Sequence, residues 1–463
     1  MTLFAPGDPR PVHFMGIAGA GMSALALIAK RRGVQITGCD QDPAGAQDLV
    51  ALGVPVSRGH DPSHLEGARA MVVTAAIPPN HPEVERARTL GVPVIRRADA
   101  LGEAVAGGTV VAIAGTHGKT TTTVMVTEGL AAAGRNPTGL VGGRVAGWGG
   151  NARQGSSELF VVEADEYDKA FLSLQPTVAV VNNVEPDHLE CYGSVDALEA
   201  AFAEFAGRAQ RVIASADDPG TRRVVSRLRV PVWTVGTDSG DVRIQDAHFS
   251  PTGSTARVRL PNGDAVALTL QVPGAHNVRN AGVALAAVHA VGANVRSAAA
   301  ALAEFRGVAR RFERLGEVDG VMVVDDYAHH PTEVAATLAG ARQAFPDRRL
   351  VAVFQPHLYS RTAAHGKALG QALAGADVAV VAPIYGAREA PMPGVTSDLV
   401  IDAARAAGAD VVKVADRAKL TADVAALLQP GDLLLTMGAG DVTRVGPEIL
   451  TKPRSAGRER APR

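Results

Sequence analysis

This sequence has few cysteines and almost no net charge. The 463 residues include only two cysteines, Cys39 and Cys191, and 46 Lys and Arg against 47 Asp and Glu give a formal net charge of −1. The two thiols match no spacing of a redox motif or metal site, which excludes a disulfide framework and is typical of a reducing cytoplasm. Without a global basic field, nothing attracts nucleic acid or an anionic membrane. Any recognition of phosphate must therefore be local.

Long apolar runs are absent as well. A membrane-spanning helix needs about 20 consecutive apolar residues, and the apolar stretch 14–29 is interrupted by Gly16, Gly19 and Gly21. We therefore expect a cytoplasmic protein that does not engage a membrane. The hydrophobic content of 46% is enough for several cores. At about 100 to 200 residues per domain, the length predicts two to four domains.

Short β-like runs alternate with alanine-rich helical segments, which is typical of parallel sheets covered by helices. We expect an α/β fold of three domains, each built on a largely parallel sheet: Rossmann-like over 1–105, P-loop-like over 106–313 and Rossmann-like over 314–450. A β-rich insert is expected near 242–272, and the polar tail 451–463 is expected to be disordered. The expected strands of the third domain end in polar residues, as ligand sites at the carboxyl ends of parallel strands require.

A phosphate loop is the clearest local motif. The segment "VAIAGTHGKTTTT" follows the pattern strand, glycine loop, helix, and its predicted phosphate-binding residues are Gly115, Thr116, His117, Gly118, Lys119, Thr120 and Thr121. Backbone N–H groups and the helix N-terminus would face the anion, the lysine would reach the β/γ-phosphates, and Thr120 would bind Mg²⁺. The spacing departs from the common P-loop, because Ile113 occupies the position of its first glycine.

A second glycine loop, "GIAGAG" at 16–21, also follows an expected strand and begins a helix. Asp40 ends the next strand, where an acidic residue can hold a ribose. The glycines are spaced as GxxGxG rather than the GxGxxG of dinucleotide-binding proteins, so nicotinamide binding is only weakly indicated. Two phosphate loops on two domains predict two phosphorylated ligands.

Acidic residues crowd the ends of two expected strands in the central domain. Carboxylates close together are tolerable if a cation lies between them, and oxygen ligands beside a phosphate loop favour Mg²⁺. A solvated acidic loop is the alternative. The candidates are Glu163, Asp165, Glu166 and Asp168 in "VVEADEYD" and Glu185, Asp187 and His188 in "NNVEPDH".

Two further motifs have polar residues suited to a nucleotide. Asn277 and Asn280 lie three apart on one face of an expected helix, where their amides suit an adenine edge, although Asn277 could equally cap that helix. The "RRF" segment 310–312 offers a guanidinium for phosphate at a domain boundary. A plain surface arginine is the alternative there.

Taken together, the motifs resemble the Mur ligases of peptidoglycan synthesis, over nearly the whole chain. The resemblance rests on "GIAGAGMS", "GTHGKTT", "EADEYD", "NNVEPDH", "HNVRNA", "RRF", "DDYAHHPTE", "QPHLYSRT" and "GAGD", in this order. It implies the alanine-adding reaction. ATP would phosphorylate the lactyl carboxylate of UDP-N-acetylmuramate, the amine of L-alanine would attack the acyl phosphate, and amide, ADP and phosphate would result. Such phosphoryl transfer needs Mg²⁺ and lysine to neutralise charge. We expect a monomer or weak homodimer.

The resemblance also implies a role for individual residues. The segment 115–121 would bind the ATP phosphates, with Thr120 and Glu163 as magnesium ligands and His188 at a second metal position. Further ATP contacts would come from Asn277, Asn280, Arg311 and Asp326. UDP-N-acetylmuramate would contact Gly16, Ala18, Gly19, Ala20, Gly21, Met22 and Asp40. The amino acid and the transferring phosphate would be surrounded by Tyr327, His329, His357 and Arg361, and the catalytic set would be Lys119, His188, His329 and Arg361.

Three other interpretations compete with this one. A recycling ligase, which attaches a tripeptide to UDP-N-acetylmuramate, shares "GTHGKTT" and "EADEYD", but "NNVEPDH" and "QPHLYSRT" favour the alanine enzyme. A nicotinamide dehydrogenase would use the first loop and leave "GTHGKTT" without a function. A nucleotide-binding switch would leave the C-terminal histidines unexplained.

Overall fold

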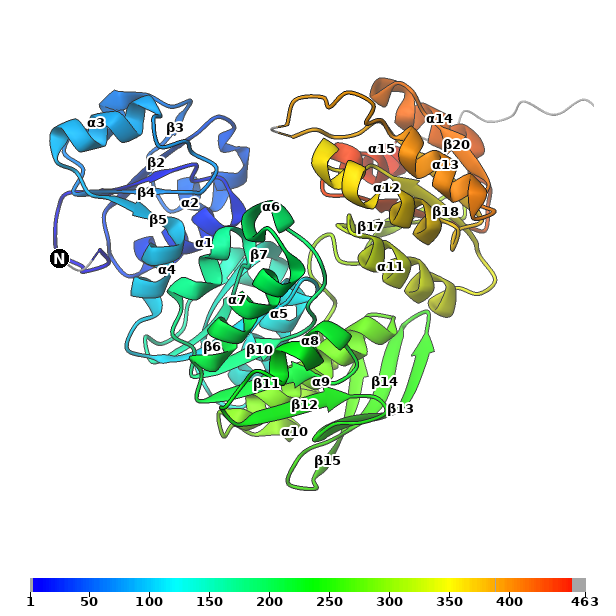
Figure 1. Cartoon of the computed structure of the whole chain (residues 1–463), viewed down its shortest axis with the longest axis horizontal. Helices are drawn as coiled ribbons and strands as arrows, with labels where there is room; N and C mark the ends of the chain where they lie inside the picture. Colours follow the sequence, from blue (N-terminus) through cyan, green and yellow to red (C-terminus); the bar gives the residue numbers. More distant parts are fainter. Residues whose placement is uncertain (1–2, 388, 452–463) are drawn as a thin grey trace, which may run out of the picture. The chain divides into compact units, whose positions relative to one another are not determined.

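The computed structural model describes residues 3–387 and 389–451, so the predicted tail falls, apart from Thr451, outside the described residues. The chain forms two compact units (Figure 1). The first contains the chain up to Val308 except His248–Ser254 and Gln271–His276, and the second contains these segments and the chain from Ala309 onward. Among the described residues, no helix is long and apolar enough to cross a membrane.

The first sheet is a five-stranded parallel sheet in the order β3-β2-β1-β4-β5, as the predicted Rossmann-like domain requires. Its strands are β1 (Val12–Met15), β2 (Ile36–Asp40), β3 (Val56–Arg58), β4 (Ala70–Val73) and β5 (Val94–Arg96). The connections contain the helices α1 (Ala20–Arg31), α2 (Gln47–Ala51), α3 (Pro82–Leu90) and α4 (Arg97–Val105), and the 3₁₀ turns η1 (Pro43–Ala46) and η2 (Pro62–Leu65).

The second sheet has ten strands in the order β15-β14-β13-β12-β11-β10-β6-β9-β7-β8. These are β6 (Thr109–Ala114), β7 (Thr138–Val145), β8 (Gly150–Arg153), β9 (Leu159–Glu163), β10 (Val178–Val181), β11 (Arg211–Ser215), β12 (Val232–Gly236), β13 (Val242–Ser250), β14 (Gly253–Arg259) and β15 (Ala265–Leu270). The predicted β-rich insert is confirmed as β13 to β15, where buried and exposed residues alternate along β14 and β15.

Helices cover this sheet, and they are α5 (Lys119–Ala132), α6 (Leu189–Tyr192), α7 (Val195–Gly207), α8 (Pro219–Val225), α9 (Ala275–Ala290) and α10 (Val295–Leu302), with the turns η3 (Ala146–Trp148) and η4 (Tyr167–Ser173). Helix α5 begins directly after the loop that follows β6. Helix α1 of the first sheet packs on β7 and β8 of the second, and Arg31 donates to the Ala152 carbonyl at 2.8 Å. One continuous hydrophobic core therefore joins the first two sheets.

The third sheet, in the second unit, has the order β16-β17-β21-β18-β19-β20. Only β16 (Glu313–Val318) is antiparallel to its neighbour; the others are β17 (Val321–Asp326), β18 (Arg349–Phe354), β19 (Val378–Val381), β20 (Val411–Lys413) and β21 (Asp432–Met437). One face packs on α11 (Pro331–Ala344), α12 (Tyr359–Leu373) and α13 (Asp398–Ala406), the other on α14 (Leu420–Leu427) and α15 (Val445–Thr451) (Figure 1). The α/β class with three mostly parallel sheets is confirmed.

Candidate functional site

The glycine loop between β6 and α5 has the backbone conformation that a phosphate loop needs. Gly115 and Gly118 have positive φ angles of 138° and 78°, which only glycine adopts without strain. A Cβ at Gly118 would lie 2.7 Å from Asn280 Oδ1 and 3.2 Å from Asn182 Nδ2. The loop is therefore tightly enclosed, and α5 begins directly after it at Lys119, where the N-terminus of a helix favours an anion.

Lys119 is buried at the start of α5. Its ammonium donates to the carbonyls of Gly115 and Thr116 at 2.7 and 3.3 Å and to Glu166 Oε1 at 2.8 Å. Burial alone would lower the pKa of Lys119, but the carboxylates of Glu166 and Asp165 raise it above its ordinary value. Lys119 is thus held beside the glycine loop in an ion pair with Glu166.

Polar residues at the end of β10 hold the glycine loop in place. The Asn183 Oδ1 accepts from the His117 amide at 2.7 Å, and the Asn182 Nδ2 donates to Thr122 Oγ1 at 3.0 Å. Thr116 Oγ1 accepts from the Glu185 amide at 2.9 Å. The two strands β6 and β10 are paired, with Ala114 opposite Val181, so their carboxyl ends meet. The motif "NNVEPDH" therefore supports the loop through its asparagines, a role that we did not assign from the sequence.

The predicted magnesium ligands Glu163 and Thr120 lie against two successive glycines of β7, Gly142 and Gly143. A Cβ at Gly142 would lie 3.1 Å from Glu163 Oε1, and one at Gly143 would lie 3.1 Å from Thr120 Cγ2. Nearby, Glu166 is only 2% exposed and its Oε2 accepts no hydrogen bond from the described residues. A buried carboxylate oxygen without a donor is costly and suits a cation. Metal binding by Thr120 and Glu163 stays a prediction.

The third predicted metal ligand, His188, precedes α6 with a positive φ of 53°. Its ring contacts that of Tyr167, with centroids 5.0 Å apart. Nε2 lies 3.6 Å from Asp187 Oδ2 and Nδ1 lies 3.4 Å from Glu190 Oε1. These carboxylates and the Tyr167 ring orient the imidazole. Its metal role also stays a prediction.

The Asn277 and Asn280 pair lies in α9. The helix begins at Ala275, so Asn277 is in its first turn and is not the capping residue. Asn277 is buried, at 6% exposure. Since Asn280 faces Gly118, the phosphate loop and the expected adenine contacts lie on the same side of the first unit.

The first glycine loop is held by the end of β2. The amides of Gly16 and Ile17 donate to the Cys39 carbonyl at 2.8 and 3.1 Å, and Asp40 Oδ2 accepts from the Ala18 amide at 3.0 Å. Gly19 is the N-cap of α1, which places Ala20, Gly21 and Met22 in its first turn. Asp40 thus organises the loop, and whether it also holds a ribose stays a prediction.

An arginine that we did not predict lies against this loop. A Cβ at Gly21 would lie 2.8 Å from Arg97 Nη1, and Arg97 Nη2 pairs with Asp165 Oδ2 at 3.3 Å. A guanidinium beside a helix N-terminus suits a diphosphate. The only signal in the sequence was the basic pair 96–97 that follows a short strand, which is too common to interpret.

In the second unit, the "ARRF" segment is fixed to the end of β17. Arg310 Nε donates to Asp325 Oδ2 at 3.0 Å. Asp326 accepts from the amides of Phe312 and Ala328, both at 2.7 Å. Burial raises the pKa of Asp326 to about 6. Asp326 therefore anchors two backbone segments, and its predicted contact with a ribose is a separate role that stays untested.

The predicted amino-acid site residues Tyr327, His329, His357 and Arg361 are brought together at the ends of β17 and β18. The ring centroids of Tyr327 and His329 are 5.1 Å apart, those of His329 and His357 are 6.1 Å apart, and Arg361 Nη1 lies 3.4 Å from His357 Nδ1. The guanidinium of Arg311 lies 5.1 Å from the centre of the Tyr327 ring. The cluster combines cations with aromatic surfaces, which suits a small carboxylate.

His329 is held in one tautomer. Nδ1 lies 2.9 Å from the Tyr327 carbonyl, so the Nδ1–H donates and Nε2 carries the lone pair. Burial lowers the pKa of His329 to about 4, and the ring is therefore neutral at physiological pH. Glu333, which we did not predict, accepts from the His329 amide at 3.1 Å. The signal in the sequence was its position in "HHPTE", three residues after His330. His330 is the N-cap of α11, and a capping box has a glutamate three residues after the N-cap.

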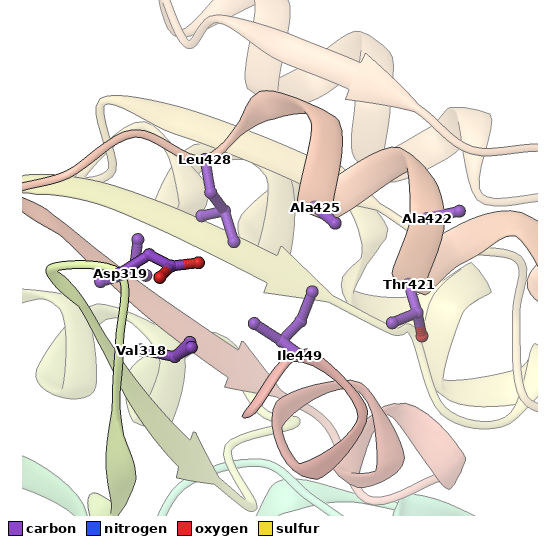
Figure 2. A pocket seen from close by; sticks show the side chains of 8 residues that line it. Val318, Asp319, Thr421, Ala422, Ala425, Leu428 and Ile449 are labelled. Atoms are coloured by element: carbon purple, nitrogen blue, oxygen red, sulfur yellow. The ribbon is translucent and has the colours of Figure 1, made fainter. Parts of the chain in front are cut away.

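An apolar pocket of the second unit lies elsewhere. Its lining residues are Val318, Asp319, Val321, Thr421, Ala422, Ala425, Leu428 and Ile449 (Figure 2). The turn between β16 and β17 borders it, at the amino end of β17, whereas the polar cluster follows the carboxyl end. With one charged lining residue, this pocket does not suit a charged ligand.

Comparisons with known proteins agree with this arrangement. Three family models match successive segments: "Mur ligase family, catalytic domain" at 11–109, "Mur ligase middle domain" at 113–288 and "Mur ligase, glutamate ligase domain" at 310–440. A UDP-N-acetylmuramate–L-alanine ligase of Streptomyces griseus is 47% identical over 96% of this chain and 98% of its own length. The corresponding ligase of Thermobifida fusca is 43% identical over 97% of this chain and 99% of its own length.

Solved structures show the same architecture. The UDP-N-acetylmuramate-alanine ligase MurC of Thermotoga maritima superposes with a TM-score of 0.81 at 28% identity, covering 95% of this chain and 98% of that one. A murein peptide ligase of Psychrobacter arcticus gives a lower TM-score of 0.72 at 27% identity, covering 96% and 98%. The likeness to the alanine ligase is thus the stronger of these two.

The contacts of Gly118 predict a specific effect of its replacement. Gly118→Ala adds a methyl group against the two asparagines, so we expect it to weaken binding of a fluorescent ATP analogue by at least about tenfold and to cost about 1 to 3 kcal/mol of stability. The matched control is Gly134→Ala, which lies just beyond the other end of α5 with a similar φ of 77° and nothing within 4 Å. Equal effects of the two variants on nucleotide binding would contradict the assignment of the loop.

Proposed function

The chain belongs to the Mur ligase family, and we propose that within it the protein joins L-alanine to the lactyl carboxylate of UDP-N-acetylmuramate at the expense of ATP. The observation that carries the proposal is the 47% identity to an alanine ligase over almost the whole of both chains. The other alanine ligases of Streptomyces, at 46% and 47% identity, support the same substrate choice. The product would be a precursor of peptidoglycan, made in the cytoplasm.

ATP and Mg²⁺ fit the residues that surround the loop 115–121. Gly118 has a positive φ, and a side chain there would collide with Asn280. The neighbouring carboxylates raise the pKa of Lys119, which favours its charged form. A buried oxygen of Glu166 accepts no hydrogen bond from the described residues. Together these groups match the polyphosphate and its cation. When bound, ATP supplies a phosphoryl group, and the ion offsets the charge of its oxygens. We propose Thr120 and Glu163 as the metal ligands, with His188 at a second position.

The chemical difficulty of the reaction is that a carboxylate does not react with an amine. Transfer of the γ-phosphoryl group to a carboxylate oxygen gives an acyl phosphate and ADP, and attack by the alanine nitrogen then forms the amide and releases phosphate. Two anions must first approach each other, so a fixed positive charge lowers the barrier. Lys119 would supply that charge, because its contacts with Glu166 and the loop carbonyls keep the ammonium in place.

The cluster in the second unit would bind the amino acid. Arg361 would pair with the alanine carboxylate, as a guanidinium binds a carboxylate with two hydrogen bonds. The free Nε2 of His329 would accept a hydrogen bond from the alanine nitrogen. Tyr327 and His357 would complete the walls of a small site. Arg311 and Asp326, on the same unit, would contribute to ATP binding as the family resemblance implies.

UDP-N-acetylmuramate would bind at the loop 16–21, with its diphosphate at the N-terminus of α1. Gly19 is the N-cap of this helix and Gly21 lies in its first turn, and Arg97 adds a positive charge beside Gly21. We accordingly propose that the domains are a UDP-N-acetylmuramate domain over 1–105, an ATP domain over 106–313 and an amino-acid domain over 314–450. The chain is proposed to act as a monomer or weak homodimer, without nucleic acid.

One assay tests the proposed function. Purified protein with ATP, Mg²⁺ and UDP-N-acetylmuramate should release phosphate with L-alanine, and not without an acceptor. Preference for the tripeptide L-alanyl-γ-D-glutamyl-meso-diaminopimelate would assign the recycling reaction instead. Phosphate release that is independent of both acceptors would refute the ligase function.

Removal of the Lys119 charge should affect turnover. We expect Lys119→Ala to lower kcat by at least about a hundredfold, since the loss of one group that stabilises transition-state charge has effects of this size. The control is Lys169→Ala, which removes an exposed ammonium from the same region and should leave kcat within about twofold. Circular dichroism would show whether Lys119→Ala is folded, and near-normal turnover of a folded variant would refute the role.

Removal of the Arg361 guanidinium should affect alanine selectively. We expect Arg361→Ala to raise KM for L-alanine by about 10 to 100 fold, because the loss of a hydrogen-bonded ion pair weakens binding by about this factor. We expect KM for ATP to change by less than about threefold. Lys367→Ala, an exposed cation on the same helix α12, is the control. A similar rise in both KM values would point to a phosphate contact rather than an alanine contact.

A further inference from the structure

A second polar cluster is buried in the first unit, beside the strand ends that hold the first glycine loop. It consists of His13 on β1, Cys39 on β2, His64 in η2 and Glu83 in the first turn of α3, and one ligand atom of each lies within 4.8 Å of all the others. The side chain of Glu83 and the whole of Cys39 are inaccessible, and His13 is 1% exposed. We propose that these four residues form a structural zinc site. Neither the reaction nor the family comparison assigns them a role.

The distances match a tetrahedral metal site. In such a site, with bonds of about 2.0 to 2.3 Å, neighbouring ligand atoms are about 3.3 to 3.7 Å apart. His13 Nε2 lies 3.3 Å from Cys39 Sγ, and the Glu83 oxygens lie 3.5 and 3.4 Å from the same sulfur. His64 Nδ1 lies 2.9 Å from Glu83 Oε1. Two of the edges of the tetrahedron, His13–Cys39 and Cys39–Glu83, are therefore already present, and a small separation of His64 from Glu83 would accommodate an ion.

The charges of the cluster also favour a divalent cation. In the described part of the chain, Glu83 forms no ion pair with lysine or arginine; its partners are His60, His64, the Cys39 thiol and the Asp61 amide. A buried carboxylate that no lysine or arginine compensates is costly. A Zn²⁺ ion held by the Glu83 carboxylate and the Cys39 thiolate is electrically neutral as a group. Binding would release the thiol proton to solvent.

The surroundings orient the ligands for metal binding. His13 Nδ1 lies 3.0 Å from Thr37 Oγ1, its partner in the β1–β2 register, which directs Nε2 toward the sulfur. A second-sphere hydrogen bond of this kind is a regular feature of histidine ligands. The imidazole of His60, whose Nδ1 lies 3.1 Å from Cys39 Sγ, belongs to the surroundings of the site.

The identity of the ion follows from the ligand types. Thiolate and imidazole together favour Zn²⁺ over Mg²⁺ and Ca²⁺, which prefer oxygen ligands. The apolar side chains of Met15, Leu65, Met71 and Val84 form a core with Cys39 and exclude water from this face of the sheet. A closed four-ligand site in such a core is structural rather than catalytic. The Cys39 carbonyl holds Gly16 and Ile17, so the ion would also stiffen the first glycine loop.

Metal titration of the full chain tests the proposal. After removal of metal with a chelator, the protein should bind one Zn²⁺ per chain in the presence of excess Mg²⁺, with a dissociation constant of about 10⁻⁷ M or tighter. Replacement of zinc by Co²⁺ should give the thiolate-to-cobalt charge-transfer absorption of a tetrahedral site. Absence of tight zinc binding, or a cobalt spectrum without a thiolate band, would overturn it. These readouts do not depend on ligase activity.

Variants locate the site. Cys39→Ser should abolish the thiolate band and weaken zinc binding by at least about a hundredfold, whereas Cys191→Ser, at the only other cysteine, should change neither. Thr37→Val keeps every ligand and the shape of the side chain, and should weaken zinc about tenfold through the lost hydrogen bond. If Cys39→Ser does not fold, Thr37→Val and His64→Gln, whose imidazole is 19% exposed, decide the question. Unchanged affinity in these variants, or loss of the band in Cys191→Ser, would refute the site.

Discussion

Parallel strand pairing constrains where polar side chains of this protein can meet. All strands of a parallel sheet end on the same edge, so the loops that follow them are neighbours whatever their distance in sequence. The pairing of β6 with β9 and β10 brings Glu163 and Asn182 beside the loop of Lys119. The pairing of β17 and β18 with β21 gathers Tyr327 and His357 in the same way. The candidate sites depend on this pairing.

Buried charge is compensated locally within each unit. Lys119 is neutralised by Glu166 and Asp325 by Arg310, each through a direct hydrogen bond. Removal of one member of such a pair leaves an uncompensated charge in a medium of low dielectric constant. The pairs therefore fix the position of each side chain more than they stabilise the fold. In the loop before α5, these contacts fix the position of the Lys119 ammonium.

Elements made of consecutive residues could be predicted from the sequence. Groups of side chains that come from distant parts of the sequence could not. The three sheets and the phosphate loop follow from local patterns, since a buried parallel strand and the loop after it are adjacent residues. The hairpin β7–β8 was missed because its glycines, Gly142 and Gly143, interrupt the apolar pattern. Arg97 and the cluster around Cys39 were missed because their partners lie far apart in sequence. Cys39 is buried, and only the β1–β2 register places it beside His13.

The four successive threonines of α5 have a consequence for how the protein folds. Thr120 to Thr123 are all buried, and β-branched residues lower the intrinsic helix propensity. Threonine hydroxyls also bond back to the helix, as Thr123 Oγ1 does to the Lys119 carbonyl at 2.8 Å. This segment is too weak a helix former to be stable without the sheet. Helix α5 packs on β6, β7 and β9, so this helix and the loop at its N-terminus depend on formation of the sheet.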